Sequence, residues 1–219
     1  HNKPLAIELD TSRSPNQYQV EHLPNVYFPC QPYPQQIAIA KTIHQALEQG
    51  KNALIDSPTG TGKTLSLLVG VLSYYSFTNL PCKLYYLTRT HSQINQVIAE
   101  LKRTCYRFQT TIITARESMC INQSLQQVKE GSSTGVVRAS VGSANASTVS
   151  GLTNQNKIIA FGIPHLREAG RTNKFCPYFH QRKYEPTSEV VVMPYNYLFD
   201  LEMLKSNKFE LANAVVLVD

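Results

Sequence analysis

The sequence lacks the features that would place a protein in or beyond a membrane. It has no basic start followed by an apolar core and a small-residue cleavage site, so there is no secretory signal. Its longest apolar run, Leu65–Phe77, is too short to span a bilayer and is interrupted by serine. The five cysteines are odd in number, irregularly spaced and without a C-x-x-C pair, which does not suit a disulfide framework. We therefore expect a soluble intracellular protein with no membrane partner.

Aspartate is absent from the middle of the chain. Between Lys83 and Lys183 there are 14 Lys and Arg residues against four Glu, a net charge of +10. The remainder has seven basic and 11 acidic residues, a net charge of −4, which together give the chain's +6. This asymmetry suggests a polyanion as partner, although a solvated basic surface without any partner explains the charge equally well.

Strand and helix patterns alternate along the 219 residues. Apolar residues recur at helical spacing, or form a buried helical run, in three segments: Gln35–Gln49, Leu65–Phe77 and Ser92–Arg103. Short apolar or aromatic runs predict five strands: Asn52–Asp56, Lys83–Thr88, Thr110–Thr114, Glu189–Met193 and Ala214–Asp219. This alternation predicts an α/β fold with a mostly parallel sheet. One stretch, residues 132–155, has no period and is rich in Ser, Gly, Thr and Asn, so we predict that it is disordered.

The strongest chemical signal is a P-loop of eight residues: Ser57, Pro58, Thr59, Gly60, Thr61, Gly62, Lys63 and Thr64. A phosphate-binding loop turns backbone N–H groups inward, which requires glycine at positions of unusual dihedral angle. The lysine then reaches the β- and γ-phosphates of a nucleotide, and the threonine hydroxyl coordinates Mg²⁺. A predicted strand before the loop and a helix after it give this motif its expected context, so we predict an ATP site here.

Two weaker motifs flank the P-loop. Gln36 follows a proline-rich turn, and its amide can both donate to and accept from an adenine edge. Thr88, Arg89 and Thr90 run from the end of a predicted strand to the start of a predicted helix, where they could clamp a phosphate. Taken alone, the first could be an ordinary polar helix start and the second an ordinary capped helix.

Six segments together resemble the superfamily 2 iron–sulfur DNA helicases. They are YPQQ (33–36), SPTGTGKT (57–64), TRTHSQ (88–93), ARESMCIN (115–122), KFCPYF (174–179) and MPYNYLFD (193–200). This family includes the xeroderma pigmentosum group D, Fanconi anaemia group J and telomere-elongation-regulator helicases. The stretches FPCQPYPQQ and RTHSQINQVIAELKRTCYR are most similar to the last of these. The resemblance is specific, because the six motifs occur in the family's order.

The resemblance implies an organisation for the chain. An extended N-terminal segment (1–25) would precede the first part of a RecA-like ATP-binding lobe (26–114). An iron–sulfur-type subdomain (115–185) would be inserted there, and the lobe would resume at 186–219 and end at the D-E-A-H box. The implied activity is ATP-driven 5′-to-3′ unwinding of DNA in repair, recombination or telomere maintenance, in the nucleus.

The resemblance also implies a role for individual residues. Gln36 would read adenine, and the P-loop would hold ATP and Mg²⁺. Asp219 would bind Mg²⁺ as the first residue of the D-E-A-H box. Lys63, Thr64 and Asp219 would thus be the catalytic residues. Thr88, Arg89 and Thr90 would contact single-stranded or duplex DNA, the polyanion that the basic middle of the chain suggests.

Two features of the sequence depart from the family pattern. The chain begins at His1 and ends at Asp219, without the glutamate that positions water or the second motor lobe. We therefore expect a fragment that binds ATP but hydrolyses it negligibly, and that needs the second lobe of the full-length chain. Measurable turnover by the fragment would refute this.

The second departure concerns the cluster. The family holds a [4Fe-4S] cluster with four cysteines, and only Cys120 and Cys176 are present, in the first and last ligand motifs. His165 or His180 could assist, but histidine ligation is not the family's pattern. Either the cluster has been lost or the segment 123–160 is altered, and we expect no assembled cluster.

Two other classes of function compete with the helicase. The chain could be a non-catalytic nucleotide- or DNA-binding module that keeps the P-loop as a folding element. The intact Lys63–Thr64 pair and Gln36 favour an enzyme over such a module. A P-loop kinase or metabolic ATPase explains neither TRTHSQ nor MPYNYLFD.

Overall fold

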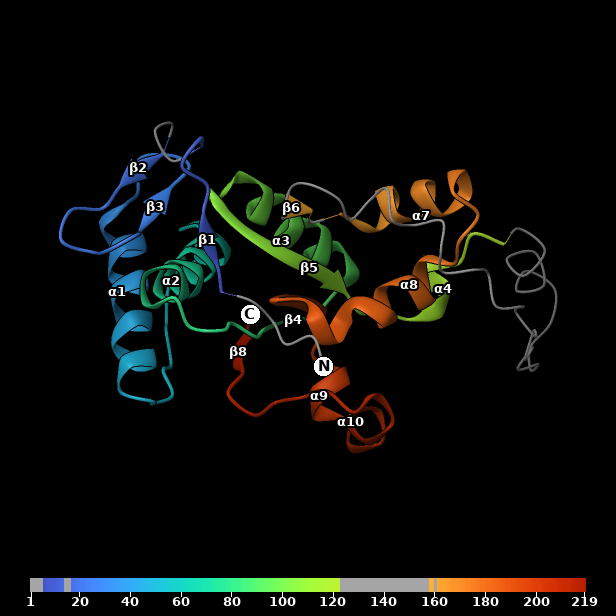
Figure 1. The fold of residues 1–219 in the computed structure, drawn as a ribbon. Coiled ribbons are helices and arrows are strands. Elements are labelled where there is room, and N and C mark those ends of the chain that lie inside the picture. The colour runs from blue at the N-terminus through green and yellow to red at the C-terminus, as the bar shows by residue number, and fades with distance from the viewer. Residues whose placement is uncertain (1–5, 14–16, 123–157, 160) are drawn as a thin grey trace.

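A mostly parallel β-sheet organises the structure. The computed structural model describes residues 6–13, 17–122, 158–159 and 161–219. The strand order is β1-β5-β7-β4-β8, with β6 also paired to β5. The strands are β1 (Glu8–Leu9), β4 (Leu84–Thr88), β5 (Tyr106–Ile112), β6 (Ile158–Ile159), β7 (Val190–Pro194) and β8 (Val215–Val218). All of these pairings are parallel except that of β1 with β5. The predicted α/β fold with a mostly parallel sheet is confirmed (Figure 1).

Three long helices lie on one side of this sheet; the second and third contact its strands, and the first packs on the second. They are α1 (Pro34–Glu48), α2 (Lys63–Thr78) and α3 (His91–Arg103), close to the three predicted segments. The amide of Gln36 caps α1 by accepting from Tyr33 N at 2.9 Å. Thr90 and Gln93 form a reciprocal capping box at the start of α3. On α3 the four apolar residues that recur at helical spacing are all buried: Ile94, Val97, Ile98 and Leu101.

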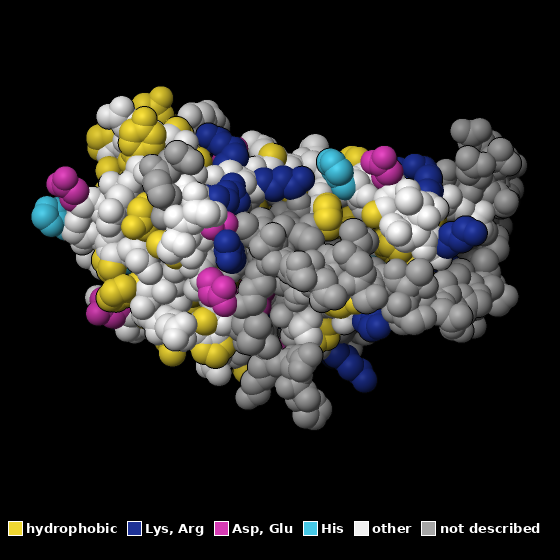
Figure 2. Space-filling view, turned by 45° about the horizontal axis from the view of Figure 1, so that its top comes forward, with side chains coloured by type: hydrophobic (Ala, Val, Ile, Leu, Met, Phe, Trp, Pro, Cys, Tyr) yellow, Lys and Arg dark blue, Asp and Glu magenta, His cyan; other side chains and the backbone are white. Residues whose placement is uncertain are grey.

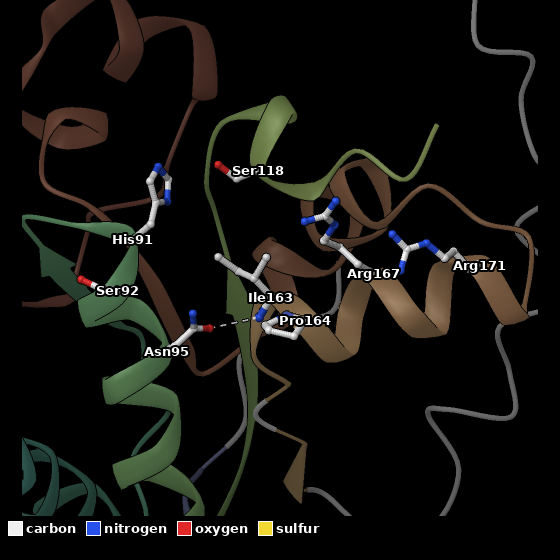
Figure 3. Close-up of a pocket in the computed structure, with 8 residues that line it drawn as sticks. All are labelled: His91, Ser92, Asn95, Ser118, Ile163, Pro164, Arg167 and Arg171. Atoms are coloured by element: carbon white, nitrogen blue, oxygen red, sulfur yellow. Dashed lines mark hydrogen bonds between the residues drawn. The ribbon is translucent and has the colours of Figure 1, made fainter. Parts of the chain in front are cut away.

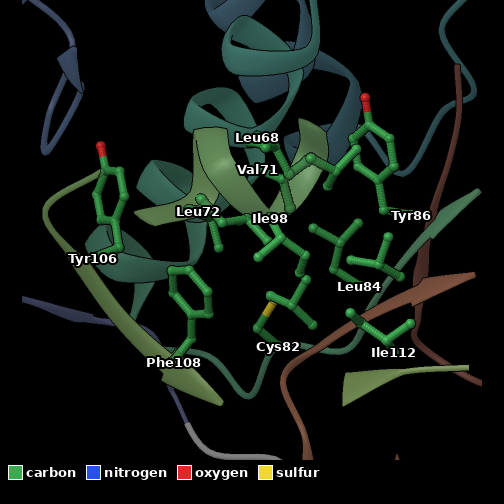
Figure 4. Packing of buried hydrophobic residues seen from close by; sticks show 14 of the residues in the cluster. Leu68, Val71, Leu72, Cys82, Leu84, Tyr86, Ile98, Tyr106, Phe108 and Ile112 are labelled. Carbon is green, nitrogen blue, oxygen red and sulfur yellow. The ribbon is translucent and has the colours of Figure 1, made fainter. Parts of the chain in front are cut away.

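The sheet separates two apolar clusters. The larger lies between the sheet and the helices α1–α3, and Figure 4 shows Leu68, Leu72 and Ile98 packed there beside strand residues. The smaller lies on the opposite face around Tyr85, Val191 and Tyr197. Because side chains alternate along a strand, the neighbours Tyr85 and Tyr86 of β4 belong to different clusters.

A group of shorter helices lies at the other end of the molecule from α1 (Figure 1). They are α4 (Arg116–Met119), α7 (Ile163–Thr172) and α8 (Pro177–Tyr184), followed by the 3₁₀ turn η4 (Glu185–Thr187). Two more, α9 (Asn196–Phe199) and α10 (Leu201–Asn207), follow β7. Gln181 of α8 accepts a hydrogen bond from the backbone of Ile112, which fixes α8 against the end of β5. Residues 132–155, predicted to be disordered, lie outside the described residues, and the division at 115 and 185 stays a prediction.

The N-terminal segment, predicted to be extended, is tied to the rest of the chain. β1 pairs with β5, and Asp10 forms an ion pair with Arg107 at 3.0 Å. The strands β2 (Tyr18–Gln19) and β3 (Tyr27–Phe28) form a separate small antiparallel sheet. Val20, Val26 and Phe28 pack there against α1 and α2.

The prediction of a strand at Asn52–Asp56 is wrong. The segment has no strand pairing, and Leu54 is fully exposed, whereas Ile55 packs against the larger cluster. Its composition is that of a strand, but a strand also needs a partner for its backbone hydrogen bonds. β8 pairs with β4, and no described segment pairs with its other edge. The other strand predictions are confirmed to within a few residues, and β5 begins four residues before the predicted Thr110.

Candidate nucleotide-binding site

The P-loop residues form a turn that leads directly into α2. Gly60 and Gly62 have φ angles of +82° and +74°. These values lie in the left-handed region, which glycine adopts more readily than other residues. Gly62 is the N-cap of α2, and Lys63 and Thr64 are the helix's first two residues. The loop therefore places backbone N–H groups and the positive end of the helix dipole at one point.

Hydrogen bonds within the loop hold its shape. The hydroxyls of Ser57 and Thr61 are 2.7 Å apart, and Thr61 also donates to Pro58 O at 2.8 Å. The ammonium of Lys63 donates to Ser57 O at 2.9 Å, so it is folded over the loop. The lysine that is expected to reach phosphate is therefore already directed toward the loop's interior.

Asp219, at the end of β8, contacts the P-loop. Its Oδ2 atom accepts a hydrogen bond from Thr64 Oγ1 at 3.0 Å, across 155 residues of sequence. The parallel pairing of β4 with β8 explains this position, because it carries β8 along the sheet to the level of the loop. The two residues predicted to bind Mg²⁺ thus lie together.

A third residue, which none of the sequence motifs indicated, belongs to this group. Tyr86 of β4 donates to the same Oδ2 atom of Asp219 at 2.7 Å. Burial raises the pKa of Tyr86, and its hydrogen bond to the Asp219 carboxylate raises it further, so the hydroxyl remains protonated. Only the pairing of the two predicted strands could have indicated this contact. In that pairing Tyr86 lies opposite Leu217, which is two residues before Asp219.

Gln36 lies directly against the P-loop. Its side-chain nitrogen would be only 2.4 Å from a β-carbon built on Gly62, so the amide occupies the space that this glycine leaves open. Gln36 is buried, and its oxygen is engaged by the Tyr33 backbone. The structure thus brings Gln36 to the loop, and its reading of adenine stays a prediction.

The three residues predicted to contact DNA differ in position. Thr88 is buried, and its hydroxyl donates to Thr90 O at 3.3 Å. Arg89 is exposed, and the exposed Thr90 is the N-cap of α3. The surface of this turn is therefore made by Arg89 and Thr90, with Thr88 behind them.

A groove of about 490 Å³ continues from this turn and joins α3 to α7. It is lined by His91, Ser92, Asn95, Ser118, Ile163, Pro164, Arg167 and Arg171. Figure 3 shows the two arginines on α7, facing the same side as Ser118, and Asn95 accepting from Ile163 N at 3.3 Å. Several Lys and Arg side chains also lie near one another on the face shown in Figure 2. The sequence predicted a basic middle of the chain, to which Arg167 and Arg171 belong, but not the groove.

A comparison with protein families identifies the chain. Residues 86–219, which begin at Tyr86 and end at Asp219, match the DEAD_2 family. The chain belongs to the DEAD_2 family. This is the family of the XPD and telomere-elongation-regulator helicases that the six motifs indicated.

Curated relatives of this DEAD_2 chain carry the name regulator of telomere elongation helicase 1. The homologue from Caenorhabditis elegans is 33% identical over 89% of the chain, and the protein from Mus musculus is 28% identical over the same share. The chain spans 24% of the first and 20% of the second. It therefore corresponds to about a quarter or less of these relatives.

Solved structures share the fold. An XPD helicase superposes on 86% of the chain with a TM-score of 0.58 at 17% sequence identity, and the match covers 32% of that structure. A truncated XPD gives a TM-score of 0.50 over 82% of the chain, at 19% identity and 50% coverage of that structure. At this identity the likeness concerns the fold.

The two cysteines predicted as cluster ligands lie at the ends of two short helices. Cys120 ends α4 and Cys176 caps the start of α8, and both are half-buried. Among the described residues, no three His, Cys, Asp or Glu side chains are grouped to hold a metal. His180 stacks between Phe175 and Tyr184, and burial lowers its pKa. The two middle ligands of the family would fall in the Ser/Gly/Asn-rich stretch at 132–155, which lies outside the described residues. In the part that is described, no helix is long and apolar enough to cross a membrane.

Proposed function

We propose that this chain is the ATP-binding part of the first motor lobe of an ATP-dependent 5′-to-3′ DNA helicase. The observation that carries the proposal is the contact between Thr64 of the P-loop and Asp219 at the end of β8. A glycine-rich turn alone can occur in many proteins. A carboxylate brought from the far end of the chain to the P-loop threonine gives that turn the second half of a nucleotide site.

The oxygen atoms at this point suit the proposed metal. Mg²⁺ prefers hard oxygen ligands, and a hydroxyl and a carboxylate lie 3.0 Å apart here. Bound Mg²⁺ would neutralise charge on the β- and γ-phosphate oxygens. Lys63 would turn from Ser57 O toward the same phosphates, while Gly60 and Gly62 leave room for them. Gln36 would contact the adenine edge from beside the loop.

DNA would pass over the turn after β4 and along the groove. Arg89 and Thr90 are exposed at one end, and Arg167 and Arg171 lie along α7. We assign these side chains to phosphate contacts, which fix position rather than sequence.

The first prediction concerns unwinding by the full-length protein, in which this chain works with a second motor lobe. We expect it to unwind a duplex with a 5′ single-stranded tail in the presence of ATP, and not one with a 3′ tail. Lys63→Ala should abolish unwinding of the 5′-tailed duplex. Unwinding that needs no ATP, or that survives loss of Lys63, would contradict the proposal.

From its similarity to the telomere-elongation-regulator helicases we also place the protein in the nucleus, in repair, recombination or telomere complexes.

The second prediction concerns the groove. Replacing Arg167 and Arg171 together by Ala should weaken single-stranded DNA binding by this chain. The slope of log affinity against log salt should fall by about 1.4, because two phosphate contacts are lost. Fluorescence anisotropy at several salt concentrations measures this. Lys102→Ala combined with Arg103→Ala is the matched control, since it also removes two positive charges and both residues are exposed in the last turn of α3. An equal loss in the control would mean that binding follows net charge alone.

A further inference from the structure

Tyr86 connects the centre of the sheet to the proposed nucleotide site. Tyr86 is fully buried in β4, which has a strand on each side, and it belongs to the larger apolar cluster. In Figure 4 the ring lies beside this cluster while the hydroxyl points away from it. A polar group at the end of a buried ring needs a partner, and its partner is the Asp219 carboxylate at 2.7 Å.

Two hydroxyls donate to one oxygen of Asp219. Thr64 Oγ1 and Tyr86 OH both contact Oδ2, at 3.0 and 2.7 Å. Neither bond involves Oδ1, the other oxygen of the carboxylate. Hydrogen bonds to a charged acceptor are stronger than those between neutral groups, so this pair fixes the rotation of an exposed side chain.

The two donors differ in how firmly they are held. Thr64 belongs to the loop and would itself become a ligand of the nucleotide's metal ion. Tyr86 is fixed by the sheet and by packing, and besides the Asp219 carboxylate its hydroxyl is close to that of Thr64. When the nucleotide enters, Tyr86 is therefore the donor that keeps Asp219 in place.

We propose that Tyr86 is a positioning residue for magnesium–nucleotide binding, acting through the Asp219 carboxylate. This inference rests on the proposed ATP site and adds to it a residue that none of the six motifs assigns to that site. Tyr86 does not touch the nucleotide or the metal. Its hydroxyl holds Oδ2, so that the carboxylate would be ordered before Mg²⁺ binds, which would lower the cost of ordering that side chain on binding.

The adjacent residue provides a matched control. Tyr85 is also fully buried in β4, but its side chain lies on the opposite face of the sheet. Its hydroxyl donates to Glu185 Oε1 at 3.0 Å and to Glu210 O at 3.2 Å. Tyr85→Phe and Tyr86→Phe each remove one buried hydroxyl from the same strand, and only the second removes a contact with Asp219.

The test measures the affinity of this chain for ATP in Mg²⁺ and, separately, in EDTA. The ratio of the two affinities gives the contribution of the metal. We expect Tyr86→Phe to reduce this ratio about tenfold, the effect of one hydrogen bond to a charged group. Binding in EDTA should be unchanged, and Tyr85→Phe should leave the ratio at the wild-type value. Thermal melts establish that both variants fold.

A double-mutant cycle separates positioning from a general structural role. Asp219→Asn should itself reduce the ratio, and adding Tyr86→Phe to it should cause no further loss. The inference is overturned if Tyr86→Phe keeps the wild-type ratio, if it weakens binding equally in Mg²⁺ and EDTA, or if its effect persists in Asp219→Asn. A folded wild-type chain that binds no ATP under either condition would instead overturn the proposed function, and the inference with it.

Discussion

At the scale of single residues, Gly60 and Gly62 have similar backbone conformations but different surroundings. Both have positive φ angles, at +82° and +74°. A β-carbon on Gly60 would meet nothing within 4 Å, whereas one on Gly62 would lie 2.4 Å from the Gln36 amide nitrogen. That amide is buried and caps α1, so it cannot move away without losing its own contact.

This difference gives a prediction for the two glycines. Gly60→Ala should cost about 1–2 kcal/mol of unfolding free energy, because an L-residue is strained in the left-handed region. Gly62→Ala should cost about 1 kcal/mol more, since it also disrupts the cap at Gln36. Denaturant unfolding of the two variants measures the difference. Equal losses would show that Gln36 adapts without cost.

At the scale of elements, the sequence predicted helices better than strand boundaries. The helix at Ser92–Arg103 could be predicted because its apolar positions recur every three to four residues and Thr90 and Gln93 form a local cap. Asn52–Asp56 shows the limit, because its residues favour a strand but pairing depends on a distant partner. The contact of Tyr86 with Asp219 also needed a register, Tyr86 opposite Leu217, that no local pattern specifies.

Among the elements, the turn η4 is joined to β4 by a buried ion pair. Lys83 and Glu185 are 3.1 Å apart with both side chains largely buried, and Lys83 also donates to Ser188 O. Burial lowers the pKa of Lys83, while the adjacent Glu185 carboxylate raises it and keeps the amine charged. Glu185→Ala should therefore destabilise the chain by about 3–5 kcal/mol, because an unpaired ammonium would remain buried.

Urea unfolding measures this loss, and a paired variant tests its cause. Lys83→Met combined with Glu185→Leu removes both charges and should recover much of the stability. If the single variant is as stable as the wild type, then the amine is already solvated or neutral. That result would show that the ion pair does not hold α8 and η4 to the sheet.

At the scale of the whole molecule, the sheet brings together residues that are far apart in sequence. The P-loop leads into α2 and Asp219 follows β8, yet Thr64 Oγ1 and Asp219 Oδ2 are 3.0 Å apart. The motifs predicted the members of this site because their order and chemistry resemble the family's. They could not predict the groove between α3 and α7, which depends on how residues 161–172 return to the lobe.

The measurement that tests the central claim most directly is binding of labelled ATP with Mg²⁺ to this chain. The wild type is compared with Lys63→Ala and with Lys51→Ala, where Lys51 is an exposed residue that precedes the loop. We predict that the wild type and Lys51→Ala bind alike and that binding collapses in Lys63→Ala, which would place ATP on Ser57–Thr64. A folded wild type that binds no ATP, or a Lys63→Ala variant that binds as the wild type does, would contradict the account.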